Sequence, residues 1–179
     1  MEIEGLRSEI LLSESDISGK VEELARRVTE DYDGKEVLLI GILRGAFVVL
    51  SDLMRKVELS CGVAFMEVSS YGAGTTSSGI VRILKDIEED ISDKHVIVVE
   101  DIIDTGITLS YLRRSLLARK PESLEFLTLL SKPSRRRVEL DVKYIGFEIP
   151  DEFVVGYGID YAGKYRNLPE IYALEENHE

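Results

Sequence analysis

A short segment of acidic and then small polar residues has the composition of a ligand-binding loop. Glu100 and Asp101 are adjacent carboxylates that follow an apolar run, and they are costly there unless they meet donors or a cation. The hydroxyls of Thr105 and Thr108, with backbone amides and a helix N-terminus, form an anion site, and Gly106 lets the backbone approach an anion closely. Ribose hydroxyls, magnesium and a phosphate would satisfy these groups, so the segment predicts a site for a phosphorylated ribose.

An ordinary helix cap is the alternative explanation for part of this segment. Asp104-Thr105-Gly106 by itself fits a cap between a strand and a helix, because Asp and Thr side chains accept hydrogen bonds from the first amides of a helix. The carboxylates that precede it are not explained by a cap. The whole stretch therefore favours a ligand site.

The elements that would hold this segment alternate between strand and helix along the chain. The run 96–99 is the clearest buried strand, and residues 109–117 follow at helical spacing. Such alternation predicts an α/β fold with an open, mostly parallel sheet, in which ligands bind beyond the carboxyl ends of the strands. Further strands are expected at 37–42, 63–68, 80–84, 123–130, 144–147 and 153–157, and further helices at 13–28 and 47–57.

Three other loops follow predicted strands and carry glycine or charge. Arg44-Gly45 follows the strand 37–42, and Lys132 follows the strand 123–130. Alone, each fits an ordinary turn or a solvated charge. The loop 69–79 is long and rich in small residues, which is typical of a mobile functional loop. The basic run 135–137 is expected to be a solvated turn or a subunit contact.

Composition narrows the class of protein. The chain has 179 residues, which fits a single domain over 1–179, and its formal net charge of −12 disfavours broad binding to nucleic acid. Cys61 is the sole cysteine, so no intramolecular disulfide is possible. No apolar run has the length of a membrane span and the start does not read as a signal peptide, so a cytoplasmic location is expected.

These segments together resemble a known family. The resemblance covers nearly the whole chain and depends on Leu43-Arg44-Gly45, Ser70-Tyr71-Gly72, Lys85-Asp86, the motif Glu100–Thr108, Lys132, and the stretch from Gly146 through Asp160-Tyr161 to Arg166. The chain is similar to the type I phosphoribosyltransferases and, within them, to the hypoxanthine and hypoxanthine–guanine phosphoribosyltransferases. The motif Glu100–Thr108 alone indicates only the superfamily.

The resemblance implies a reaction and a fold. A 6-oxopurine base would react with 5-phosphoribosyl 1-pyrophosphate to give the nucleoside monophosphate (IMP or GMP) and pyrophosphate, with Mg²⁺ as cofactor. The base would be hypoxanthine or guanine, and the sequence does not fix the ratio of the two activities. The fold would be a central mostly parallel sheet flanked by helices, with a small hood built from residues 1–12 and 146–179. A flexible lid would span 69–79. The small-molecule substrates would be the only ligands besides the metal, and a homodimer or homotetramer is implied.

The resemblance also assigns roles to individual residues. Asp104 would manage the ring proton of the base. The ribose and metal would meet Glu100 and Asp101, with Asp160 as a further metal-linked carboxylate. The remaining roles are 5′-phosphate binding by Asp104, Thr105, Gly106, Ile107 and Thr108, pyrophosphate binding by Arg44, Gly45, Ser70, Tyr71 and Arg166, and base binding by Lys132, Phe153, Val154 and Asp160.

Three alternatives stay open at this point. A xanthine-preferring or other 6-oxopurine enzyme would share these motifs. A nucleotide-sensing regulator on the same fold would need an extended basic face, which the net charge disfavours. A dinucleotide or P-loop enzyme is disfavoured because neither G-x-G-x-x-G nor G-x-x-x-x-G-K-[ST] is present.

Overall fold

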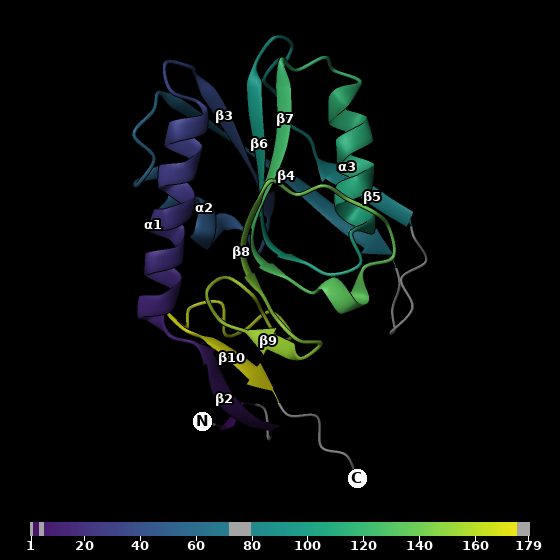
Figure 1. Ribbon diagram of the computed structural model, residues 1–179. Helices are drawn as coiled ribbons and strands as arrows, with labels where there is room; N and C mark the ends of the chain where they lie inside the picture. Colours follow the sequence, from purple (N-terminus) through teal and green to yellow (C-terminus); the bar gives the residue numbers. More distant parts are fainter. Residues whose placement is uncertain (1, 4–5, 72–79, 175–179) are drawn as a thin grey trace.

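The computed structural model describes residues 2–3, 6–71 and 80–174, and the strands within these residues form two sheets (Figure 1). The larger sheet has the strand order β5-β4-β3-β6-β7-β8, and the smaller sheet has the order β1-β2-β10-β9. The elements are β1 (Glu2–Ile3), β2 (Leu6–Leu12), α1 (Glu14–Asp31), β3 (Val37–Leu43), α2 (Phe47–Met54), β4 (Cys61–Tyr71), β5 (Ile80–Lys85), β6 (His95–Ile103), α3 (Ile107–Leu117), β7 (Ser123–Ser131), the 3-10 turn η1 (Pro133–Arg135), β8 (Tyr144–Glu148), β9 (Phe153–Val155) and β10 (Ile171–Leu174).

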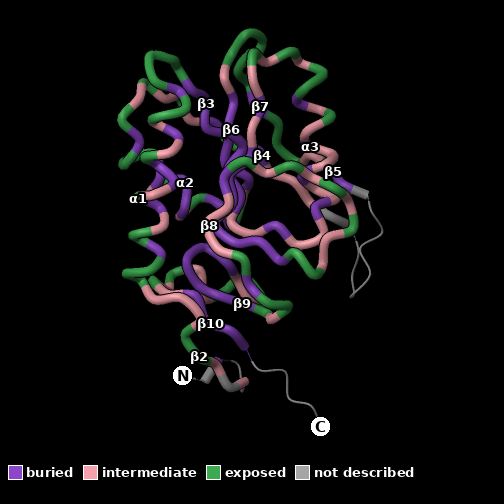
Figure 2. The backbone as a smooth tube through the Cα atoms, viewed as in Figure 1, coloured by how far each residue is buried: buried purple, intermediate pink, exposed green. Residues whose placement is uncertain are grey.

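The larger sheet is mostly parallel, as the sequence predicts. Strands β4, β3, β6, β7 and β8 pair in parallel, and β5 is antiparallel to β4. Helices α1 and α2 pack on one face of this sheet and α3 on the other, so the central strands are apolar on both sides (Figure 1). The buried residues run through the middle of the molecule (Figure 2).

Helix α1 lies where the sequence predicts a helix, and it begins at a capping box. The Ser13 hydroxyl accepts a hydrogen bond from the Asp16 amide, and the Asp16 carboxylate accepts one from the Ser13 amide. The apolar stripe of the helix then faces the sheet, where Val21, Leu24 and Val28 are fully buried. This packing fixes one face of the larger sheet beneath the site.

The strand order places two predicted loops side by side. The chain passes from β3 to β4 on one side and reaches β6 on the other side of β3. The loops after β3 and β6 therefore start from adjacent strands and lead to opposite sides, which creates the crevice where α/β sheets bind ligands. Residues 44–45 and 100–108 meet at this position.

The smaller sheet is the hood, and it joins the two ends of the described chain. Strand β2 pairs antiparallel with β10, which pairs antiparallel with β9. Ile3, Val155, Tyr172 and Leu174 form its small core. The sequence expectation that the hood begins at residue 146 is wrong by a few residues, because 146–148 belong to β8 at the edge of the larger sheet.

Some predicted boundaries also differ. Strand β6 continues to Ile103, so Glu100 and Asp101 lie within the strand and not beyond it. Helix α2 ends at Met54, before the expected residue 57, and β9 ends at Val155. Of the predicted lid, residues 72–79 lie outside the described residues, as do the side chains of Ser70 and Tyr71.

None of the helices in residues 2–3, 6–71 and 80–174 is both long and apolar enough to cross a membrane.

Candidate active site

The two adjacent carboxylates of β6 are buried at the carboxyl end of the sheet. Glu100 is only 8% exposed. Burial raises the pKa of Glu100 well above its ordinary value, and the neighbouring Asp101 carboxylate raises it further. Burial also raises the pKa of Asp101, although its contacts with backbone amides and the charge of Arg166 oppose the change. Such a pair is set to share a proton or to meet a cation.

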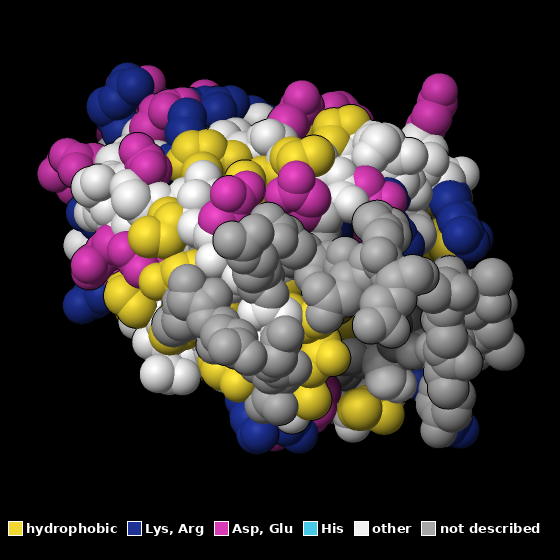
Figure 3. Space-filling model, turned by 90° about the horizontal axis from the view of Figure 1, so that it is seen from below, with side chains coloured by type: hydrophobic (Ala, Val, Ile, Leu, Met, Phe, Trp, Pro, Cys, Tyr) yellow, Lys and Arg dark blue, Asp and Glu magenta, His cyan; other side chains and the backbone are white. Residues whose placement is uncertain are grey.

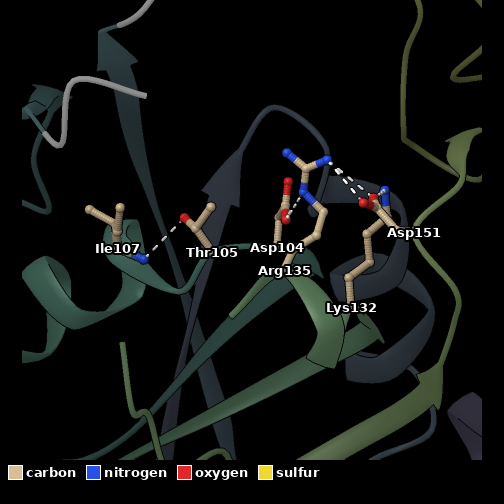
Figure 4. A network of polar contacts seen from close by, with 6 residues as sticks. All are labelled: Asp104, Thr105, Ile107, Lys132, Arg135 and Asp151. Carbon is tan, nitrogen blue, oxygen red and sulfur yellow. Dashed lines mark hydrogen bonds and ion pairs between the residues drawn. The ribbon is translucent and has the colours of Figure 1, made fainter. Parts of the chain in front are cut away.

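The turn after β6 leads directly into α3. Its N-cap is Gly106, which has a positive φ of 80°, so the prediction of a glycine that frees the backbone here fits the structure. The Thr105 hydroxyl accepts a hydrogen bond from the Ile107 amide at 3.4 Å (Figure 4). The first amides of a helix have no partners within the helix, so this end of α3 offers donors to an anion.

Asp104 forms an ion pair with a residue of the η1 turn. The Arg135 Nε lies 2.7 Å from the Asp104 Oδ1, and Figure 4 shows the guanidinium between the carboxylates of Asp104 and Asp151. The Asp104 Oδ1 is fully buried, and in the described residues it has no hydrogen-bond partner besides this ion-pair contact. The whole side chain is 41% exposed, so the accessible carboxylate oxygen is Oδ2.

Lys132 is a buried cation beside Asp104. It is 8% exposed, and its Nζ lies 3.9 Å from an oxygen of Asp151. Burial lowers the pKa of Lys132, while the charges of Asp104 and Asp151 oppose that change. Its amide donates to the carbonyl of Ile103 at 2.9 Å, which fixes the ends of β6 and β7 together. The Lys132 amine, which is a donor, and the Asp104 carboxylate, which is an acceptor, therefore lie near each other.

The hood presents an exposed aromatic ring two residues after Asp151. Phe153 is 47% exposed and lies edge-to-face against Tyr161, with ring centroids 5.5 Å apart. Val154 is 4% exposed and packs into the core. An exposed ring on a short strand can stack on a planar ligand.

The loop after β3 approaches β6 so closely that it requires glycine. A Cβ at Gly45 would lie 1.6 Å from the Asp101 Oδ2. The preceding peptide between Leu43 and Arg44 is cis. The Arg44 side chain is 75% exposed, and its Nε is 3.8 Å from a Glu67 oxygen. The structure thus brings the backbone of this loop to the carboxylate pair, with the arginine directed to solvent.

Arg166 and Asp160 reach the same place from the hood. Arg166 donates to the carbonyl of Gly158 at 2.6 Å and pairs with Asp160 at 2.6 Å. A Cβ at Gly158 would lie 2.3 Å from the Gly45 carbonyl oxygen, so this segment packs directly on the loop after β3. Asp160 therefore belongs to an ion pair beside the loop after β3, and its expected contact with the base stays a prediction.

Metal-ligating side chains are only partly gathered. Within the described residues, no group of three or more His, Cys, Asp or Glu side chains is arranged to hold a metal. Glu100 and Asp101 are adjacent, whereas Asp160 is engaged with Arg166 and with the Gly163 amide at 2.7 Å. This set corresponds to a cation held by one or two carboxylates together with substrate oxygens, which is how Mg²⁺ is usually bound.

A cavity of about 840 Å³ lies behind the loop after β3, between α1, α2 and the hood. It shares Arg166 with the site and is otherwise lined by residues such as Phe47, Val48 and Tyr157. The segment 100–108 does not line it. The cavity is therefore a neighbour of the ligand crevice.

The basic run 135–137 contains residues that the sequence interpretation missed. Arg137 is exposed, as expected of a solvated turn, but Arg136 packs against Gly106 and donates to the Ser131 hydroxyl at 2.9 Å. The Nη1 of Arg136 is buried without a hydrogen-bond partner in the described residues. No periodicity or motif marks these positions, because most of their contacts are with segments distant in the sequence, chiefly the turn after β6.

This architecture defines a class of protein that binds a phosphorylated ribose at the end of a parallel sheet. A family model described as the phosphoribosyl transferase domain matches residues 8–162. The hypoxanthine phosphoribosyltransferase of Escherichia coli K12 is 53% identical over 165 residues, which cover 91% of this chain and 93% of that protein. The hypoxanthine-guanine phosphoribosyltransferase of Staphylococcus aureus Mu50 is 47% identical over 167 residues and 93% of each chain.

Solved structures show the same similarity. A crystal structure of a hypoxanthine-guanine phosphoribosyltransferase from Bacillus anthracis, with a HEPES molecule in its active site, has a TM-score of 0.90 and 48% identity. The match covers 95% of this chain and 99% of that one. The chain belongs to the type I phosphoribosyltransferases and, among them, to the hypoxanthine and hypoxanthine–guanine phosphoribosyltransferases of purine salvage (EC 2.4.2.8).

Proposed function

We propose that the chain joins hypoxanthine or guanine to the ribose 5-phosphate group of 5-phosphoribosyl 1-pyrophosphate. A panel of bases measures the ratio of these two activities. The observation that carries this proposal is the placement of Asp104 and the buried Lys132 just beyond the ends of the adjacent strands β6 and β7, close enough for the Asp104 charge to act on the Lys132 amine. Lys132 can donate to the exocyclic oxygen of a 6-oxopurine. Asp104 can accept the proton that the ring nitrogen loses as it attacks the anomeric carbon.

The other residues fit the rest of the substrate. The turn at Thr105 and Gly106, with the N-terminus of α3, would hold the 5′-phosphate, and Ile107 and Thr108 would supply further donors. Arg166, with the backbone at Arg44 and Gly45, would contact the pyrophosphate. Phe153 would stack on the purine, with Val154 beside it. Ser70 and Tyr71 are proposed to close over the pyrophosphate, which would protect an oxocarbenium-like state from water.

Glu100 and Asp101 fit a magnesium ion. Burial raises both pKa values, the Asp101 charge raises that of Glu100 further, and a cation between the carboxylates would offset both causes. When bound, Mg²⁺ would neutralise charge on the pyrophosphate as it leaves. Glu100 and Asp101 would bind this ion or would bind the ribose hydroxyls directly. Asp160, which lies in the hood, would be a further carboxylate linked to the metal.

A panel of bases tests the proposal. We expect the wild-type protein to form nucleotide from hypoxanthine with kcat/KM at least about 100-fold above that for adenine, because adenine offers no acceptor to Lys132. Lys132→Gln should lower kcat/KM for hypoxanthine by about 100-fold and reduce this discrimination. Lys94→Gln, an exposed lysine at the other end of the sheet, is the control. Comparable turnover of adenine by the wild-type protein would refute the base assignment, and a xanthine preference would replace hypoxanthine as the substrate.

We further propose that the protein acts in the cytoplasm as a homodimer or homotetramer. On the face seen from the hood end, Lys and Arg side chains lie in separate groups near the margin, and Asp and Glu side chains lie both at the margin and further in (Figure 3). This distribution agrees with the net charge of −12 and favours a small-molecule enzyme over a regulator that binds nucleic acid.

A further inference from the structure

Four charged side chains of alternating sign form a chain across the base end of the site. Lys132 approaches Asp151 at 3.9 Å, Asp151 pairs with Arg135 at 3.1 Å, and Arg135 pairs with Asp104 at 2.7 Å. Figure 4 shows this order, with Arg135 between the two carboxylates. The outer members are the two residues assigned to the purine, and Arg135 links one of them to the hood.

Arg135 connects three separate segments. Asp104 lies in the turn after β6, and Arg135 lies in η1 after β7. Asp151 lies in the turn between β8 and β9, two residues before the exposed ring of Phe153. A single guanidinium therefore fixes the residue that handles the base proton relative to the strand that carries the stacking ring.

The backbone around Arg135 is held in place by other contacts. The Arg137 amide donates to the Thr105 carbonyl at 3.0 Å, and the Arg135 amide donates to the Lys132 carbonyl at 3.2 Å. These bonds attach η1 to the turn that carries Asp104. The ion pair is thus formed between two anchored segments, which lowers the entropic cost of holding it.

The geometry leaves one carboxylate oxygen available to a ligand. Arg135 covers the buried Oδ1 of Asp104, and the exposed part of the side chain contains Oδ2. The ion pair at 2.7 Å therefore fixes which of the two oxygens remains available. Lys132 and Arg136 are two further cations near this carboxylate. Asp151 is a second anion near Lys132, and Glu148 is a second anion near Arg136.

We propose that Arg135 is a positioning residue for Asp104, which it holds by the buried Oδ1 so that Oδ2 is directed at the purine. Through Asp151 it also fixes the turn that leads to Phe153. This inference rests on the proposed role of Asp104 in accepting the base proton. It predicts that Arg135 affects turnover through Asp104, and affects purine binding through Asp151.

A mutant cycle between the two residues tests the inference. Arg135→Gln should lower kcat with hypoxanthine by about 5- to 20-fold in the wild-type background, and Arg135→Lys should restore part of the loss because it returns a charge without the planar fork. In an Asp104→Asn background the same Arg135→Gln change should alter kcat by less than about 2-fold, since interacting residues are non-additive. Arg137→Gln, two residues away and exposed, should match the wild type.

The outcomes separate this inference from the proposed function. If Asp104→Asn retains wild-type turnover, the role of Asp104 fails and the inference fails with it. If Asp104→Asn is impaired but Arg135→Gln is either harmless in the wild-type background or equally damaging in both backgrounds, only the inference is overturned. Circular dichroism melts of each variant show whether a loss of activity is a loss of folded protein.

Discussion

The two ends of the larger sheet both carry polar clusters, but their groups are satisfied to very different degrees. At the amino end, the Tyr144 hydroxyl donates to Asp31 at 2.6 Å and Lys143 pairs with the same carboxylate at 2.9 Å. His95 contacts the Ser123 hydroxyl at 2.7 Å. These groups satisfy one another within the protein.

At the carboxyl end, the buried groups are not all satisfied within the protein. Burial raises the pKa of both Glu100 and Asp101. The buried Nη1 of Arg136 has no hydrogen-bond partner in the described residues. Buried polar groups are normally paired, so the unpaired ones mark where a ligand completes the structure. Substitutions at the two ends should therefore have opposite effects on activity and on stability.

Asp104→Asn should show the largest effect. Without the carboxylate that accepts the base proton, kcat with hypoxanthine should fall by at least about 100-fold, in the range of a lost general base. The melting temperature should change little, because the side chain is 41% exposed. Steady-state kinetics and thermal melts measure both quantities. Wild-type turnover in this variant would remove Asp104 from the mechanism.

Glu100→Gln should reduce activity and stabilise the ligand-free protein. We expect kcat/KM for phosphoribosyl pyrophosphate to fall by about 10-fold, because a neutral amide binds a cation and ribose hydroxyls less well. The raised pKa means that the folded state binds a proton more tightly than the unfolded state. The resulting stability is present at low pH and is lost as pH rises through the folded pKa.

The difference in stability should therefore grow with pH. We expect the melting temperature of Glu100→Gln to exceed that of the wild type by about 2–4 °C at pH 8, with a smaller difference at pH 5. Glu125→Gln on the neighbouring strand β7 is the control. An equal or lower melting temperature for Glu100→Gln at pH 8 would contradict the interpretation of the carboxylate pair as destabilising.

Tyr144→Phe at the amino end should have the smallest effect on catalysis. Loss of the hydrogen bond to Asp31 should lower the free energy of unfolding by about 1–2 kcal/mol, because the acceptor is charged and the tyrosine is buried. Activity should stay within about 2-fold of the wild type. Urea unfolding and initial rates measure the two effects. A catalytic defect comparable to that of Glu100→Gln would show that the amino end also serves the reaction.

The sequence predicted the contiguous parts of this site better than the assembled ones. The strand, the glycine turn and helix α3 follow from apolar runs and from Gly106, which are local signals. The ion pair of Arg135 with Asp104 depends on how η1 packs against the turn after β6, and no local sequence pattern indicates this packing. The end of β6 was placed too early because carboxylates rarely continue a buried strand.

Other assignments stay predictions. The roles of Ser70 and Tyr71, the lid over 69–79 and the single domain over 1–179 depend on the family resemblance, and residues 72–79 lie outside the described part of the chain. The roles of Asp160 towards the metal and the base also stay predictions. In the described structure its carboxylate pairs with Arg166.

The pairing of β2 with β10 sets an order in which the protein becomes complete during synthesis. Strand β10 ends at Leu174, and β9, which carries Phe153, pairs with β10 and not with its own sequence neighbours. A ribosome-bound chain can form the larger sheet and its phosphate turn before these residues emerge. The Phe153 ring, which is proposed to stack on the base, is supported only after β10 has been translated. A nascent chain should therefore bind phosphorylated ribose before it can hold a purine.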